Sequence, residues 1–344
     1  MSATAKAQDD PAVFLAQAQA LAHAALPRWE LDVAAIEPIK VRENAVFRLV
    51  LAGGARAVLR IHRRGYHSDA ALRSEFAWMR ALEAAGIAVP TVILSRRGHE
   101  FEVVETRELA GPRQVDVFQW IEGRQLGSVE TGVNVAGDAG TVAVQYHTIG
   151  ALMARMHNQS TGWRFPAGFV RHSWDSAGLV GEQPLWGRFW ELAALTPAQR
   201  SLLLEARAQI VQQLAAYGAG SDRYGLIHAD LVPENILVNG HDMRVIDFDD
   251  AGFGWHLFDV ATSLYFLTGD NLYPVARTSV LRGYRSERPL PDDVVDHLVL
   301  FMAARATTYL GWVHTRQGTE TARELTPFLV ERACAASEEF LRAR

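Results

Sequence analysis

The stretch His228-Ala-Asp-Leu-Val-Pro-Glu-Asn-Ile-Leu-Val238, followed by Val245-Ile-Asp-Phe-Asp-Asp250, decides the fold. Apolar and β-branched residues end the first segment and begin the second, as in two short strands. Between them, Asn239-Gly-His-Asp242 is rich in turn-forming residues. The sequence therefore predicts a β-hairpin in this part of the chain.

The expected register of this hairpin brings two polar side chains together. A four-residue loop pairs Val238 with Met243, and continuing the ladder outward sets Asn235 beside Ile246. Asp247 is the next residue along the second strand. We therefore expect Asn235 and Asp247 at the open end of the hairpin, where two oxygen ligands suit one Mg²⁺ ion.

Asp230, Asn235 and Asp247 have the spacing of a phosphoryl-transfer site, because the pattern His-x-Asp-x₄-Asn is complete. An Asp can accept the proton of a hydroxyl group, while an Asn and a second Asp can hold Mg²⁺ on the phosphates of a nucleotide. The same residue types are also common turn formers. The strand-loop-strand context favours the phosphoryl-transfer interpretation.

Length and composition exclude several classes of protein. The chain has 344 residues, of which 49% are hydrophobic and 21% charged, so it can bury one large core or two modest ones. A formal net charge of −5 offers no basic face for nucleic acid, which we do not expect as a partner. The single cysteine, Cys334, cannot form an internal disulfide and points to a reducing compartment or to indifference about redox.

No targeting or membrane segment is evident. The first ten residues lack the apolar region of a secretory signal, and no run of about 18 uninterrupted apolar residues follows. We therefore expect a cytoplasmic protein without a membrane partner. The Ala- and Gln-rich stretch from Ala12 to Ala25 predicts an amino-terminal helix.

The next part of the chain predicts a strand pair that leads into a helix. Two apolar segments, Ala45–Leu51 and Arg56–Ile61, flank the glycine turn Ala52-Gly-Gly-Ala55. Ser68 can then cap a helix that runs to Gly86 and carries apolar residues on one face.

These motifs together resemble the aminoglycoside phosphotransferase and choline kinase superfamily of protein-kinase-like folds, closest to its bacterial stress-response Ser/Thr kinases and small-metabolite (homoserine-type) kinases. The resemblance implies an α+β, bilobal fold with a small β-rich lobe containing one helix and a larger, mostly helical lobe. It implies an extension over residues 1–28, an amino-terminal lobe over 29–118, a hinge over 119–123 and a carboxy-terminal lobe over 124–344.

The resemblance also assigns the nucleotide site. Arg60 stands where the family usually has the Lys that grips the phosphates, and Glu75 on the next helix is its expected partner. The alternative is an exposed strand Arg and a solvated helix Glu. The hinge carbonyl of Gln119 and amide of Ile121 are expected to hold adenine. The turn Arg42-Glu-Asn44 occupies the place of the usual glycine-rich loop.

Two features favour a small acceptor over a protein. Val232 stands where protein kinases have a Lys that meets the γ-phosphate, and the short interval from Asp247 to Asp259 leaves no room for an activation segment. In the small-molecule branch, Asp259 would resemble the buried Asp that bonds the backbone of the catalytic loop. His228 is expected to support that loop by hydrogen bonds.

Several further expectations concern the second half of the chain. Asp249 and Asp250 either help to hold a second Mg²⁺ or cap the following helix. A helix over Thr148–His157 would place His157 at its end, as a cap or surface residue. An apolar helix is expected over Pro291–Arg316, and another from Leu202 to Leu214.

The sequence therefore predicts an ATP- and Mg²⁺-dependent phosphotransferase that moves the γ-phosphate to a hydroxyl group of a small metabolite or antibiotic-like acceptor. Asp230 would position and deprotonate the acceptor. Two alternatives stay open. The segments Glu43-Asn44, His62–His67 and Asp247–Asp250 resemble those of bacterial stress-response Ser/Thr kinases. Arg60 and the missing glycine loop fit a nucleotide-binding regulator instead. The acceptor itself cannot be read from these residues.

Overall fold

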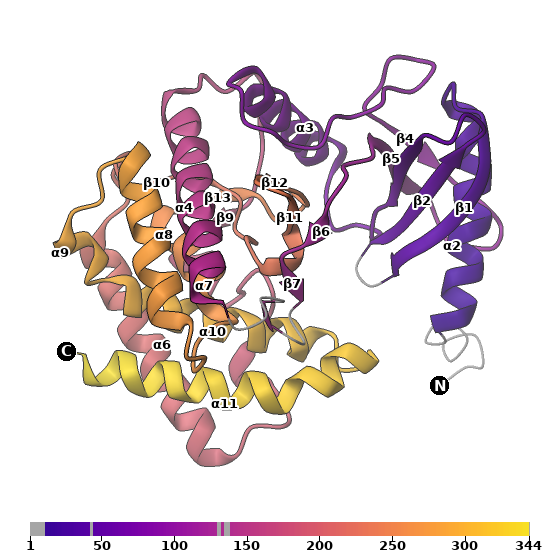
Figure 1. Cartoon of the computed structure of the whole chain (residues 1–344). Helices are drawn as coiled ribbons and strands as arrows, with labels where there is room; N and C mark the ends of the chain where they lie inside the picture. The colour runs from indigo at the N-terminus through magenta and orange to yellow at the C-terminus, as the bar shows by residue number, and fades with distance from the viewer. Residues whose placement is uncertain (1–10, 42–43, 129–131, 134–137, 344) are drawn as a thin grey trace. The chain divides into compact units, whose positions relative to one another are not determined.

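The computed structural model describes residues 11–41, 44–128, 132–133 and 138–343 (Figure 1). The chain divides into two compact units, each described here by itself. Unit 1 consists of Met1–Glu83, Ala88–Glu122 and Phe165–Val170, and unit 2 of Ala84–Ile87, Gly123–Arg164 and Arg171–Arg344.

Unit 1 is built on a five-stranded antiparallel sheet. Its strand order is β1-β2-β3-β5-β4. The strands are β1 (Val33–Val41), β2 (Ala45–Leu51), β3 (Arg56–Ile61), β4 (Phe101–Val104) and β5 (Arg113–Gln119). The strand pair predicted from the sequence is confirmed as β2 and β3, with the Leu51 amide donating to Ala55 across the glycine turn at 2.8 Å.

Helix α2 (Pro11–Ala25) covers one face of this sheet (Figure 1). It confirms the predicted amino-terminal helix and continues into the short 3-10 helix η1 (Leu26–Arg28). Because side chains alternate across a strand, Phe47 and Leu49 of β2 point into the same core as Leu21 and Trp29. This apolar core holds the sheet on which Arg60 is placed.

Helix α3 (Asp69–Ala84) follows the sheet strands, as predicted. The Ser68 hydroxyl accepts a hydrogen bond from the Ala71 amide at 3.2 Å and so caps the helix, and Gly86 follows its end with φ of +77°. Leu72 and Phe76 are buried on one helix face, and Glu75 lies between them in the sequence and is buried too.

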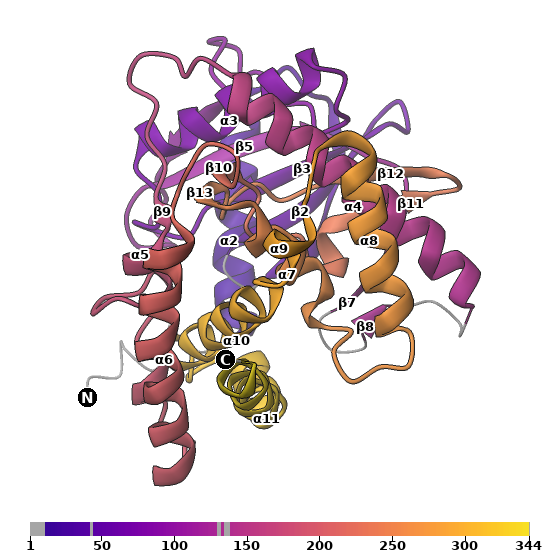
Figure 2. The same cartoon turned by 90° about the vertical axis from the view of Figure 1, so that its left-hand side faces the viewer.

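Unit 2 is mainly helical. Its helices are α4 (Ala139–Gly162), α5 (Ser176–Val180), α6 (Pro197–Tyr217), α7 (His256–Tyr265), α8 (Tyr273–Glu287), α9 (Asp292–Val295), α10 (Leu298–Thr315) and α11 (Glu320–Arg342), with the 3-10 turns η2 (Phe189–Glu191) and η3 (Pro233–Asn235). Helices α4 and α8 lie side by side (Figure 2). A Cβ atom on Gly283 would lie only 1.9 Å from the His147 carbonyl oxygen, so this close helix pair depends on glycine.

Three small sheets complete unit 2. One has the order β10-β13-β9, the second β12-β11-β6, and the third pairs β7 with β8. Their strands are β6 (Arg124–Gln125), β7 (Gly127–Ser128), β8 (Gly132–Val133), β9 (Ser173–Trp174), β10 (Tyr224–Ile227), β11 (Ile236–Asn239), β12 (Asp242–Val245) and β13 (Gly252–Trp255).

Two helix predictions need correction. The helix predicted to end at His157 continues to Gly162, so His157 lies inside α4 and is fully buried. The expected helix over Pro291–Arg316 is broken into α9 and α10, which are separated by Asp296 and His297. The expected helix from Leu202 to Leu214 is confirmed as part of α6.

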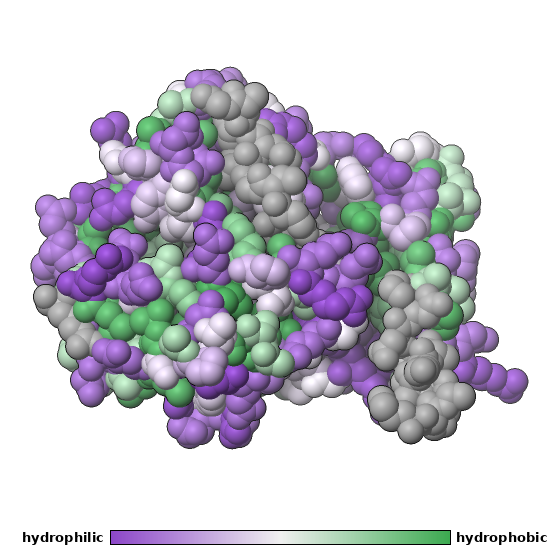
Figure 3. Space-filling view, turned by 90° about the horizontal axis from the view of Figure 1, so that it is seen from below, coloured by the Kyte–Doolittle hydropathy of each residue, from purple (hydrophilic) through white to green (hydrophobic). Residues whose placement is uncertain are grey.

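The surface mixes residue types. On the face shown in Figure 3, hydrophobic residues form small groups between hydrophilic ones. Among the residues that the structure describes, no helix is both long and apolar enough to cross a membrane.

Candidate active site

The loop between β10 and η3 is held by hydrogen bonds to its backbone. The carboxylate of Asp259 on α7 accepts the amide hydrogens of His228 and Ala229 at 3.0 and 2.7 Å. Ala229 has φ of +64°, a left-handed conformation that is strained for a residue with a Cβ atom. The predicted role of Asp259 is confirmed, because its two bonds maintain this strained turn just before Asp230.

His228 supports the same loop from inside. Its Nδ1 accepts a hydrogen bond from the Asp230 amide at 3.3 Å, and its Nε2 lies 3.1 Å from the Ile246 carbonyl oxygen. Burial lowers the pKa of His228, so the ring is neutral and can accept at one nitrogen while donating at the other. The expected supporting role of His228 is confirmed, and it ties the loop to the second strand of the hairpin.

Both oxygens of Asp230 have partners. Asn235 donates from Nδ2 to Oδ2 at 2.8 Å, and Arg305 on α10 donates from Nη2 to Oδ1 at 2.6 Å. Burial raises the pKa of Asp230 to about 6, with Arg305 acting against this rise and Asp250 adding to it. The side chain keeps 21% exposure, so it can still meet an acceptor. Arg305 was not found from the sequence, because it lies far along the chain inside an apolar helix.

The hairpin has the predicted register but a shorter loop. Val238 pairs with Met243, and the Ile246 amide donates to the Asn235 carbonyl at 2.9 Å. The four-residue loop was wrong: Asn239 and Asp242 pair as well, which leaves two residues in the turn. The register survives because this extra pair only extends the same ladder.

Asn235 and Asp247 flank the open end of this hairpin. With Nδ2 of Asn235 donating to Asp230, its Oδ1 is the end that suits a cation. Asp247 has φ of +65°, which is a left-handed backbone conformation that residues other than glycine seldom adopt. Amide and carboxylate oxygens are suitable Mg²⁺ ligands, so these residues fit the predicted metal role.

The segment after Asp247 is held by side chains that the sequence did not single out. The buried Arg171 donates from Nε to the Ala251 carbonyl at 2.5 Å and from Nη2 to the carbonyl of Asp249. Trp174 of β9 donates to the Asp250 carbonyl at 2.8 Å. These contacts fix the backbone directly beyond the predicted metal ligand.

Asp249 and Asp250 do not cap a helix. The next helix, α7, begins at His256, after strand β13 has intervened, and its first turn has no side-chain cap. The capping alternative was therefore wrong. A contribution of these carboxylates to metal binding stays a prediction.

In unit 1, Arg60 and Glu75 form the predicted pair, with Nη2 and Oε1 2.9 Å apart. Both side chains are buried, so the alternative of an exposed Arg and a solvated Glu was wrong. Asp116 lies opposite Arg60 in the β3–β5 register and accepts from its Nε and Nη2 at 2.9–3.2 Å. His62 adds a contact of 2.6 Å to Asp116.

Asp116 was not among the predicted site residues, although an Asp within the apolar run Val115-Asp-Val-Phe118 indicates a buried charge. Burial acts to raise its pKa, but Arg60 and His62 outweigh burial, and the pKa is lowered. Asp116 is therefore ionised and forms a charged pair with Arg60. Its two-pronged contact sets the plane of the guanidinium group.

The remaining nucleotide-site predictions rest on backbone groups. Gln119 ends β5, and its amide donates to the Thr91 carbonyl at 2.9 Å. Ile121 is half-buried. The Asn44 side chain accepts from the Arg63 amide at 3.0 Å, while Arg42 and Glu43 lie outside the described residues. Adenine binding by Gln119 and Ile121 stays a prediction.

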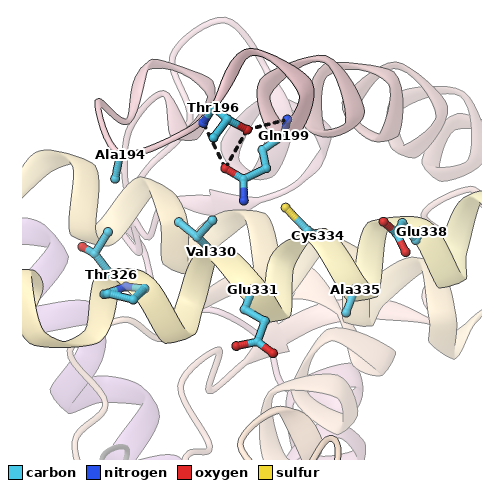
Figure 4. Close-up of a pocket in the computed structure, with 10 residues that line it drawn as sticks. Ala194, Thr196, Gln199, Thr326, Val330, Glu331, Cys334, Ala335 and Glu338 are labelled. Carbon is cyan, nitrogen blue, oxygen red and sulfur yellow. Dashed lines mark hydrogen bonds between the residues drawn. The ribbon is translucent and has the colours of Figure 1, made fainter.

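Unit 2 also has a hollow between α6 and α11 (Figure 4). Val330 and Cys334 of α11 point towards Thr196 and Gln199 at the start of α6, while Glu331 points away. Thr196 and Gln199 satisfy each other in a capping box. None of the predicted site residues lines this hollow, so it is not the candidate active site.

The sheet of unit 1, the helices of unit 2 and the braced catalytic loop define a protein-kinase-like phosphotransferase. The chain belongs to the phosphotransferase enzyme family, whose sequence model matches residues 35–292. The family and fold predicted from the sequence are thus confirmed.

Three relatives show the range of this family. A microcompartment-associated aminopropanol kinase is 30% identical, with a TM-score of 0.83 over 94% of this chain and 98% of its own. The amicoumacin kinase hAmiN, solved with AMP-PNP, Ca²⁺ and Ami, is 20% identical, with a TM-score of 0.72 over 97% and 96%. A homoserine kinase of Rhizobium johnstonii is 25% identical over 72% of this chain and 71% of its own. The chain is accordingly a kinase that uses an alcohol group as acceptor.

The buried charge cluster yields a stability prediction. Arg60→Met leaves Asp116 and Glu75 as buried carboxylates without their cation, which should cost about 3–5 kcal/mol of unfolding free energy. Arg56→Met on the same strand is the matched control, because the pair of Arg56 with Glu122 is exposed and should contribute about 0–1 kcal/mol. Urea denaturation measures both, and equal losses would contradict the buried pairing.

Proposed function

We propose that this kinase transfers the γ-phosphate of ATP, with Mg²⁺, to the hydroxyl group of a small amino alcohol. The observation that carries the proposal is Asp230, held at both oxygens at the start of the hairpin that bears Asn235 and Asp247. An ionised carboxylate fixed in this way can accept the hydroxyl hydrogen and orient the oxygen for attack on phosphorus.

The charges near Asp230 support an acceptor that carries an ammonium group. Asp250 and Glu234 both lie close enough to raise the pKa of Asp230, so Arg305 faces an excess of carboxylates. Mg²⁺ would neutralise part of this negative charge. The remaining carboxylate charge would attract a substrate that carries a positive charge. The likeness to an aminopropanol kinase over nearly the whole chain, and to homoserine kinases, supports the same class.

Each residue then has a defined task. Asn235 and Asp247 hold Mg²⁺, which neutralises charge on the phosphates. Arg60, oriented by Glu75 and Asp116, holds phosphate oxygens through a planar cation. The backbone of Gln119 and Ile121 holds adenine.

The acceptor class is tested with the purified protein, ATP and Mg²⁺. We expect ADP release and a phosphorylated product with 1-amino-2-propanol, ethanolamine or homoserine. Two matched controls separate the groups: 1,2-propanediol lacks the ammonium, and n-propylamine lacks the hydroxyl. Equal turnover with the diol would contradict an ammonium-binding site, and label incorporated only into casein or into the protein itself would favour a protein kinase.

Asp230 is tested by Asp230→Asn. The isosteric amide keeps the size of the side chain but cannot take a proton, and it leaves one of the two donors, Asn235 or Arg305, without an acceptor. We therefore expect kcat to fall by about 10²–10⁴-fold while ATP affinity stays within a few-fold. Asp222→Asn, at an exposed carboxylate paired with Arg223, is the control and should leave kcat unchanged. A near-normal kcat for Asp230→Asn would remove Asp230 from the mechanism.

Asp247 is tested by Asp247→Ala. Loss of a charged oxygen ligand should abolish the Mg²⁺-dependent part of ATP binding, measured by calorimetry with and without Mg²⁺. Asp242→Ala, at the exposed first position of β12 in the same hairpin, is the matched control. Unchanged Mg²⁺ dependence in Asp247→Ala would refute the metal assignment.

A further inference from the structure

Arg305 is a fully buried cation in an otherwise apolar helix, α10. A buried guanidinium group loses its hydration and needs several polar partners. Arg305 donates from Nη1 to the Ala229 carbonyl at 3.1 Å, and from Nη2 to Asp230 Oδ1 and to the Tyr309 hydroxyl, both at 2.6 Å. The Arg305 side chain therefore holds both the backbone of the strained Ala229 and the carboxylate of the next residue, Asp230.

Aromatic rings limit where this guanidinium group can lie. Its central carbon is 4.2 Å from the ring centroid of Tyr309, 5.0 Å from that of Trp186 and 5.4 Å from that of Phe258. Contacts of this length are favourable for a cation over a ring face. Tyr309 contributes both its ring and its hydroxyl, so it is the main support of Arg305.

The catalytic loop supplies no cation of its own. The segment from His228 to Asn235 contains no Lys or Arg, His228 is neutral, and Val232 is a buried apolar residue. The positive charge beside Asp230 thus comes from a helix distant in the sequence.

We propose that Arg305, supported by Tyr309, is the positioning residue of the acceptor site and holds Asp230 in the orientation that receives the acceptor hydroxyl. The inference rests on the proposed function, in which Asp230 meets the acceptor. Arg305 and Asn235 each occupy one oxygen of the carboxylate, and a carboxylate has further lone pairs for the substrate. Because Arg305 is itself fully buried, it acts through Asp230 and not on the substrate.

The test compares Arg305→Met, Arg305→Lys and Tyr309→Phe with the control Arg332→Met. Arg332, on α11, donates to the Tyr265 carbonyl at 2.9 Å but does not contact the catalytic loop. Steady-state kcat and KM are measured with 1-amino-2-propanol and ATP. In Arg305→Met the Asp230 carboxylate loses one of the two donors that orient it, so kcat should fall by about 10²-fold. Arg305→Lys keeps a cationic donor and should recover part of this kcat.

Tyr309→Phe tests the support of Arg305. It removes the hydrogen bond to Arg305 and should lower kcat, while the KM for ATP should stay within a few-fold in every variant. If Arg305→Met does not fold, Arg305→Lys and Tyr309→Phe decide the matter. Wild-type kcat in both would overturn the proposal, as would a loss in Arg305→Met that Arg332→Met shares.

A measurement without substrate distinguishes this inference from the proposed function. Crystal structures of the variants show the orientation of the Asp230 carboxylate directly. We expect Asp230 Oδ1 to leave its wild-type position in Arg305→Met and to keep it in Arg332→Met. An unchanged Asp230 side chain in Arg305→Met would overturn the inference, whereas failure of every amino alcohol as substrate would overturn only the proposed acceptor class.

Discussion

The hydrogen bonds from the catalytic-loop backbone to the buried carboxylate of Asp259 are the contact on which the site depends. They hold Ala229 in a left-handed conformation that its own side chain disfavours, and this turn directs Asp230. His157 of α4 in turn lies 3.1 Å from Asp259 and 2.9 Å from the Tyr284 hydroxyl. Helices α4, α7 and α8 thus share in fixing one strained turn, which explains why a buried charge is kept there.

Arg60 in unit 1 and Arg305 in unit 2 are both buried, and each is held by several hydrogen-bond acceptors. Arg60 is held by carboxylates from a neighbouring strand and from α3, and Arg305 by the catalytic loop and a tyrosine of its own helix. Burying a charge is costly unless other groups compensate it, so the hydrogen bonds of each guanidinium group favour one geometry over others. In a planar guanidinium group this fixes direction as well as charge, which a lysine cannot do.

Sequence reasoning succeeded where neighbouring residues decide the outcome. The β2–β3 pair, the capped helix α3 and the register of the β11–β12 hairpin follow from alternation, capping and turn residues within short segments. The predictions were wrong where two local signals conflict. Asn239 and Asp242 are residue types that are common in turns, yet they pair as ladder residues of β11 and β12. His157 was predicted to end its helix as a cap or surface residue. In the structure it is buried inside α4, where its ring lies 2.9 Å from the Tyr284 hydroxyl of α8.

The sequence alone determined the family, the protein-kinase-like fold and the spacing that puts Asp230, Asn235 and Asp247 in one loop and hairpin. Only the tertiary structure decided which partners surround them. Asp116, Arg171 and Arg305 are separated from the groups they hold by tens of residues, with a separation of 75 between Arg305 and Asp230. Periodicity and turn rules predict contacts only within a helical turn or between the adjacent strands of a hairpin. These three side chains reach their partners because tertiary packing brings distant elements together.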